Sequence, residues 1–186
     1  MVPLSALWLP VVVSAVLVFV ASSVIHMALG YHNGDYGPLP REDDIITALR
    51  PMHIPPGDYF LPYAGGMAAM KDPAFQDKWN KGPVATLTVM APGGNFMGAQ
   101  LAQWVLYAAT IAFFSGYVAS RTLPVGAHYL LVFRVVGATA FMGYALGLWQ
   151  MVIWYKRSLS TTLKSTFDGL LYASLTAGAF GWLWPS

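Results

Sequence analysis

Apolar residues run without a charged residue from Leu7 to Tyr31, and this stretch organises the chain. About 20 apolar residues in a helix cover the roughly 30 Å hydrocarbon core of a bilayer. A secretory signal peptide cleaved near 21–23 is the competing interpretation. It is disfavoured because a basic leading region is missing and the apolar run continues past that point. We therefore expect a membrane-spanning helix at 7–31.

Three further apolar stretches follow a long polar segment. The polar segment covers 32–98, and the apolar stretches lie at about 99–119, 127–154 and 165–184. Their lengths suit membrane spans, with some tilt for the longest of them. The pattern predicts an all-α membrane protein, a four-transmembrane-helix bundle with a small mixed cap between spans one and two. We expect one membrane domain over 1–186, with no helix break inside a span.

The segment 32–98 is too rich in apolar and aromatic residues for a disordered linker. Proline followed by acids at 40–44 predicts a short helix, and an Asp-Pro start with a Lys-Gly end predicts another at 72–82. Aromatic or β-branched runs at 58–63 and 84–90 predict strands. We expect these elements to form a cap on the membrane surface.

Composition supports the membrane class. Hydrophobic residues make up 56% of the 186 residues and charged residues 10%, whereas an ordinary soluble domain has about 25% charged residues. The net charge of +2, with no basic run, argues against nucleic acid as a partner. The absence of cysteine excludes disulfides, thiolate metal sites and cysteine nucleophiles.

The distribution of positive charge gives an orientation. On the side of 32–98, the residues near the membrane are Arg41, Lys156, Arg157 and Lys164. The other side has Arg121, Arg134 and the amino terminus. The positive-inside rule therefore favours 32–98 on the cytoplasmic side.

Small residues recur at four-residue spacing in the later spans, which places them on one helix face. They are Ala108, Ala112, Gly116 and Ser120 in the second span, Gly143 and Gly147 in the third, and Gly169, Ala173, Ala177 and Gly181 in the fourth. Membrane helices pack by close contact at such residues, so we expect a tight bundle. Contact between one of these faces and a partner subunit is the alternative.

Several polar residues fall at the same end of the predicted spans, beside 32–98. They are His26, Gln100, Gln103, Gln150 and Asp168. If these side chains point inward they form a polar cluster, which His32 and Asp35 would join. Polar groups inside a bilayer are expensive, and two interpretations stay open. The cluster is either structural, through hydrogen bonds between helices, or a site for a ligand, a proton or a metal.

His26, His32 and Asp35 supply two imidazoles and a carboxylate, a set that suits zinc, copper or iron. The spacing matches no established metal motif, and we expect no resident cofactor. Haem is disfavoured further because His26 and His128 fall near opposite membrane faces. Arg134 lies well inside a span, and we expect it to be a structural charge that can reach the interface, where the carboxyl terminus is an available partner on the same side.

The chain carries no recognisable catalytic motif, and we expect no catalytic residues. Two segments, SSVIHMALGYHNGDYGPLPRED at 22–43 and FGWLWPS at 180–186, resemble bacterial four-span membrane proteins carried in genomes as hypothetical. The resemblance covers most of the chain. It implies a bacterial inner-membrane protein without an assigned activity, and it locates no site.

The function that these observations favour is a non-catalytic accessory or assembly subunit that packs against a larger membrane complex. One alternative is a small ligand-binding or transport unit that uses the polar cluster, and the other is a metal- or haem-binding membrane protein. Intact spans argue against transport, because transporters often use broken helices. The expected partners are the lipid bilayer and a protein, or a second copy, bound through the small-residue helix faces.

Overall fold

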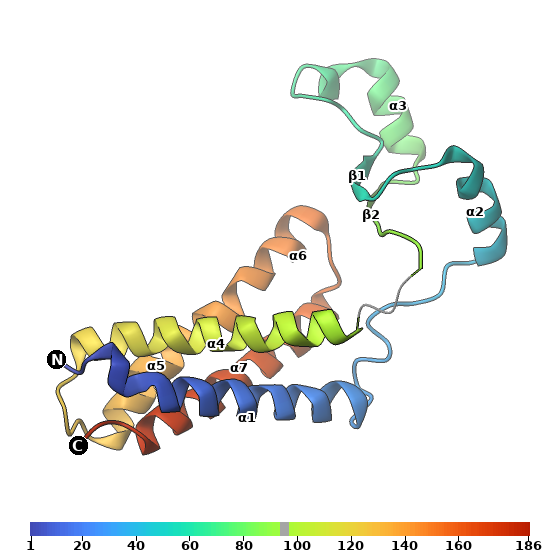
Figure 1. The fold of residues 1–186 in the computed structure, drawn as a ribbon. Helices are drawn as coiled ribbons and strands as arrows, with labels where there is room; N and C mark the ends of the chain where they lie inside the picture. The colour runs from blue at the N-terminus through green and yellow to red at the C-terminus, as the bar shows by residue number, and fades with distance from the viewer. Residues whose placement is uncertain (94–96) are drawn as a thin grey trace. The chain divides into compact units, whose positions relative to one another are not determined.

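The computed structural model describes residues 1–93 and 97–186, which form two units. The helical unit combines Met1–Gly37 with the chain from Met97 to Ser186, and the small unit begins at Pro38 and is described to Gly93. The two units are coloured along the chain in Figure 1. The small unit corresponds to most of the predicted cap.

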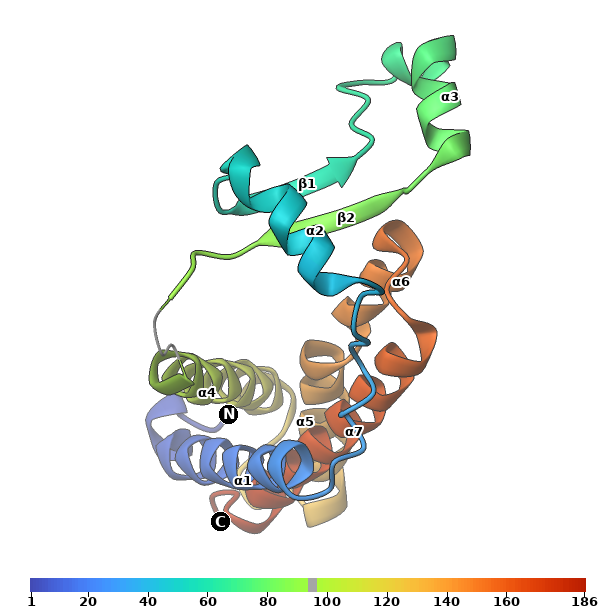
Figure 2. The same cartoon turned by 90° about the vertical axis from the view of Figure 1, so that its right-hand side faces the viewer.

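Long helices of the helical unit pack as a closed ring. They are α1 (Trp8–Met27, preceded by a 3-10 turn at Leu4–Leu7), α4 (Met97–Thr122), α5 (Tyr129–Tyr144) and α7 (Leu159–Trp182). Helix α1 contacts α4 and α7, and α5 contacts the same two helices, with the most extensive contact between α5 and α7. Figures 1 and 2 both show α1 alongside α4. Each helix therefore buries one face against two neighbours.

Within residues 1–93 and 97–186, three helical segments are long and apolar enough to cross a membrane. They are Leu4–Met27, Met97–Thr122 and Tyr129–Tyr155. The predicted first, second and third spans fall on these segments. Helix α7 has 24 residues but is not one of these three segments. It carries Lys164 and Asp168 as well as many hydroxyl side chains.

The third predicted span is not one continuous helix, so the expectation of unbroken spans was wrong. Helix α5 ends at Tyr144, a 3-10 turn follows at Leu146–Leu148, and α6 (Trp149–Tyr155) completes the segment. Ala145 between them has φ −121° and ψ −46°, outside the helical region. The apolar pattern continues across this point, which is why it does not reveal the break.

Glycines surround the break and allow close packing there. Gly143 precedes it, and its carbonyl accepts a 2.8 Å hydrogen bond from the Tyr107 hydroxyl of α4. On α7, a Cβ added to Gly169 would lie 2.9 Å from the Cβ of Ala145. Only glycine at 169 lets α7 approach α5 this closely, because real Cβ atoms do not come within 3.0 Å of such neighbours.

The small-residue stripes of α4 and α7 face the inside of the ring, which confirms that they mediate helix contact. Ala108, Ala112 and Ala177 are fully buried. A Cβ on Gly116 would lie 2.7 Å from the Phe180 ring. These two faces are therefore used within the chain and are closed to a partner subunit. In the third span Gly147 has no neighbour within 4 Å of its added Cβ.

The small unit contains the predicted helices and strands. In chain order they are α2 (Glu42–Leu49), a 3-10 turn at Arg50–Met52, β1 (Gly57–Leu61), a 3-10 turn at Ala69–Lys71, α3 (Pro73–Lys81) and β2 (Ala85–Val89). Strands β1 and β2 pair antiparallel, with Gly57 opposite Val89 and Leu61 opposite Ala85.

The caps of α3 follow the sequence signals. The Asp72 carboxylate accepts a 2.8 Å hydrogen bond from the Ala74 amide, which satisfies one free donor of the first turn. Gly82 ends the helix with φ +64°, a conformation that glycine adopts without strain.

Arg134 is exposed on α5. In the part of the chain that the structure describes, no ion pair joins it to the carboxyl terminus. The end of the chain is held instead by the α4–α5 loop. The Gly126 amide donates to the Pro185 carbonyl at 2.8 Å, and the Trp184 indole donates to the Pro124 carbonyl at 2.9 Å.

Candidate functional site

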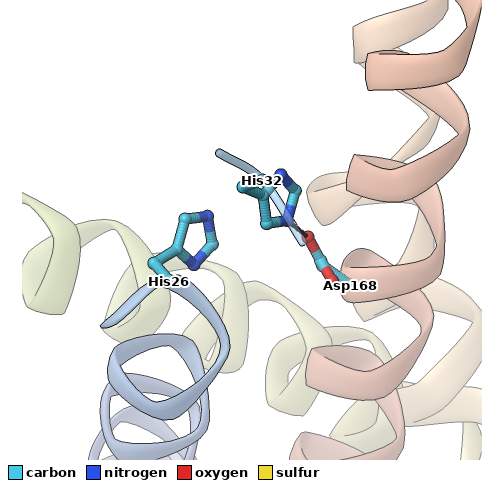
Figure 3. A group of neighbouring side chains, drawn as sticks. All are labelled: His26, His32 and Asp168. Atoms are coloured by element: carbon cyan, nitrogen blue, oxygen red, sulfur yellow. Dashed lines mark hydrogen bonds and ion pairs between the residues drawn. The ribbon is translucent and has the colours of Figure 1, made fainter. Parts of the chain in front are cut away.

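A cluster of ionisable side chains lies where α1 ends and the next loop contacts α7. His26 belongs to the last turn of α1, and Tyr31 and His32 come from the loop at 28–37. Asp168 projects from α7 and is only 4% exposed. Figure 3 shows His32 between His26 and Asp168. These groups all belong to the helical unit.

His32 bridges two carboxylates. Its Nδ1 lies 2.7 Å from Asp35 Oδ2 and its Nε2 lies 2.8 Å from Asp168 Oδ2. The three side chains are at most 13% exposed. Each ring nitrogen of His32 thus has a carboxylate oxygen within hydrogen-bond distance, so the imidazole links the loop residue Asp35 to Asp168 on α7.

Lys164 and Tyr31 occupy the remaining carboxylate oxygens. Lys164 Nζ donates to Asp35 Oδ1 at 2.9 Å and to the Tyr31 carbonyl at 2.7 Å. The Tyr31 hydroxyl donates to Asp168 Oδ1. The hydrogen bonds from His32 and then from Lys164 hold the pKa of the Asp35 carboxyl below its ordinary value. Together, the contacts of Lys164, His32 and Tyr31 hold the loop against α7.

His26 stacks on this network. Its ring centroid lies 4.5 Å from that of His32, with an interplanar angle of 5°. Its Nδ1 lies 3.0 Å from the Ser22 carbonyl one turn earlier, so it donates there and leaves Nε2 as the available nitrogen. The Ser22 hydroxyl in turn accepts a 2.8 Å hydrogen bond from Trp104 of α4. The end of α1 is thus tied to a second helix.

His26, His32 and Asp168 form a group with the donor types of a metal site. Each offers one ligand atom, and these atoms lie within 4.8 Å of one another. The sequence pointed to His26, His32 and Asp35. In the structure Asp168 takes the third place, while Asp35 holds the opposite nitrogen of His32. The sequence analysis placed Asp168 in the polar cluster and not in the candidate metal site. In the structure, Asp168 contacts His32 and so belongs to both.

The predicted glutamines do not join this cluster. Gln100 and Gln103 on α4 and Gln150 on α6 are exposed. Gln103 lies nine residues before Ala112, about two and a half turns, and so on the face opposite the buried stripe. Gln150 lies beyond the break after α5. The polar cluster is therefore smaller than expected and is built from α1, its loop and α7.

Sequence reasoning missed Tyr31 and Lys164. Lys164 precedes Asp168 by four residues, so both lie on one face of α7, and this spacing was a usable signal. No comparable signal identifies Tyr31, because its contacts depend on the conformation of the loop.

No protein-family model, curated protein or solved structure matches this chain.

Proposed function

We propose that the protein is an accessory subunit of a bacterial inner-membrane complex and that it binds its partner protein through the small unit. One observation carries this proposal. None of the described residues from 38 to 93 is buried, although many are large and apolar. Leu39, Tyr63, Met67 and Met90 are 59–80% exposed.

A unit without buried residues lacks the usual source of stability. A two-stranded sheet is marginal in water by itself, and a domain of about 60 residues is marginally stable because it buries only about 60% of the surface that its unfolded chain exposes. Disulfides are excluded because the chain has no cysteine. Large exposed apolar surface of this kind marks an interaction site, and methionine and aromatic residues are enriched in protein interfaces.

The charge of the small unit favours a protein over a lipid surface as the occupant. Between residues 38 and 93, Asp and Glu outnumber Lys and Arg by one, and three of the acids are consecutive at 42–44. Binding to anionic lipid needs clusters of Lys and Arg. The small-residue faces of α4 and α7 are used within the helical unit, so these two faces are not open to a partner.

The proposal includes α7 as a fourth membrane span. Its 24 residues give about 36 Å of helix, and it packs on α1 and α5. Figure 1 shows both chain termini at the same end of the helical unit, as four passes require. We place the small unit on the cytoplasmic side, on the strength of the positive residues near the membrane at 156, 157 and 164.

Cysteine labelling tests the proposal, because the natural chain has no cysteine to interfere. Met67→Cys and Met90→Cys are labelled with a maleimide reagent in opened native membranes and again after purification and reconstitution into phosphatidylethanolamine–phosphatidylglycerol vesicles. Lys156→Cys, exposed in the α6–α7 turn, is the control. We expect slow labelling of both variants in native membranes, fast labelling after reconstitution and no change for the control.

Two results would overturn this proposal. Fast labelling in native membranes would show that nothing covers the small unit there. Slow labelling in the lipid vesicles as well would show that lipid, or a second copy of the chain, covers it without another protein. Dilution of the chain in the vesicles separates these last two cases, since only contact between copies weakens on dilution.

A further inference from the structure

We propose that His26, His32 and Asp168 bind one divalent transition-metal ion, with zinc as the best match, at the end of α1. The inference is independent of the proposed function. The site combines residues from three parts of the chain, namely the end of α1, the loop that follows it, and α7.

The donor set and its spacing suit such an ion. Imidazole nitrogen and carboxylate oxygen bind zinc at about 2.0–2.2 Å, which places ligand atoms about 3.3 Å apart in a tetrahedral site. The three ligand atoms here lie within 4.8 Å of one another, and His32 Nε2 is already 2.8 Å from Asp168. The widest separation would have to close by at most about 1.5 Å, from 4.8 Å to about 3.3 Å, which leaves one position for water or another ligand.

The surroundings of both histidines are those of metal ligands. Histidines that bind metals through Nε2 donate their Nδ1–H to a carboxylate or a backbone carbonyl, which fixes the tautomer. His26 Nδ1 has the Ser22 carbonyl at 3.0 Å, and His32 Nδ1 has Asp35 at 2.7 Å. Both Nε2 atoms are therefore the nitrogens available to an ion. A simple ion pair between His32 and Asp168 does not require the orientation of His26.

The two imidazole rings stack in parallel, with centroids 4.5 Å apart and an interplanar angle of 5°. The stacking places the two histidines side by side. Because a ring nitrogen binds a metal in the plane of its ring, the rings must tilt toward each other to share one ion. His26 is exposed, which gives the ion a path from outside, while Asp168 is buried behind His32. Lys164 and Tyr31 keep the loop fastened while the site is filled.

Metal titration of the full chain tests the site. The protein is purified in mild detergent, stripped with a chelator, and titrated with Zn²⁺ by calorimetry and with Co²⁺ by visible absorption. We expect one ion per chain and a Co²⁺ spectrum typical of four-coordinate nitrogen and oxygen ligands. His26→Ala and Asp168→Asn should each weaken binding more than about tenfold. Loss of an outer partner of a ligand typically costs 10–100-fold, so Asp35→Asn should also weaken it.

His53→Ala is the matched control, because His53 is an exposed histidine of the small unit. Its affinity should equal that of the natural chain. Far-UV circular dichroism verifies that each variant is folded, and His26→Ala is the decisive variant because His26 lies outside the hydrogen bonds between the loop and α7. The inference fails if the natural chain binds no ion, or if folded His26→Ala binds Zn²⁺ as tightly as the natural chain does.

Discussion

At the scale of single residues, the cluster around His32 holds the loop at 28–37 against α7 and also forms a candidate metal site. Counting from the predicted helix ends placed His26 and Asp168 at the same end of their helices, because the rise per residue of a helix is constant. The same count placed three glutamines at that end, but they do not join the cluster. Depth along a helix does not determine which face of the helix a side chain occupies. The contacts of loop residues such as Tyr31 cannot be predicted from helical periodicity.

Lys164→Met removes two of the hydrogen bonds between the loop and α7, those to Asp35 and to the Tyr31 carbonyl. Charged hydrogen bonds contribute about 1.5–3 kcal/mol, and Lys164 is 28% exposed, so we expect a loss of about 1–2 kcal/mol in the free energy of unfolding. Thermal unfolding in detergent measures it. The exposed Lys156→Met should change stability by less than about 0.5 kcal/mol. Equal effects of the two substitutions would show that Lys164 does not hold the loop against α7.

Tyr107→Phe removes the hydroxyl that donates to the Gly143 carbonyl beside the helix break. A typical hydrogen bond contributes about 0.5–1.5 kcal/mol, and we expect a loss of that size in the free energy of unfolding. Tyr117→Phe is the control, because it makes the same change on the exposed face of α4. If both variants unfold at the same temperature as the natural chain, the hydroxyl does not support the break.

At the scale of elements, apolar length predicted the helices, and cap residues predicted α3. The break after α5 escaped prediction because leucine, tryptophan and methionine continue the apolar run through 146–151. The break depends on contacts with other helices, above all on the close approach of α7 at Gly169, which no local pattern records.

Gly169→Ala should be destabilising because its Cβ would meet Ala145 at 2.9 Å and Tyr144 at 3.3 Å. Overpacking of this kind costs about 1–3 kcal/mol, and thermal unfolding in detergent measures the loss. Gly178→Ala on the same helix is the matched control. Its nearest neighbour would be the Tyr129 hydroxyl at 3.7 Å, an ordinary contact, so stability should be unchanged or slightly higher. A harmless Gly169→Ala would contradict the close packing of α5 and α7.

At the scale of the whole molecule, the chain combines a packed helical unit with a small unit that has no buried residue among those described. The strand pair and the helices of the small unit were predictable from turn and cap residues. The lack of a core was not, because the segment contains enough apolar residues to suggest one. Where those side chains lie is a property of the folded chain and not of its composition.

The central claim is that the small unit is incomplete without a partner protein, and hydrogen–deuterium exchange tests it most directly. The full chain is placed in lipid nanodiscs without other proteins, and amide exchange is followed by mass spectrometry. We expect the amides of β1 and β2 to exchange within seconds to minutes, while those in the centre of α5 stay protected for hours, because local stability follows buried contacts. Protection of β1 and β2 equal to that of α5 would contradict the account.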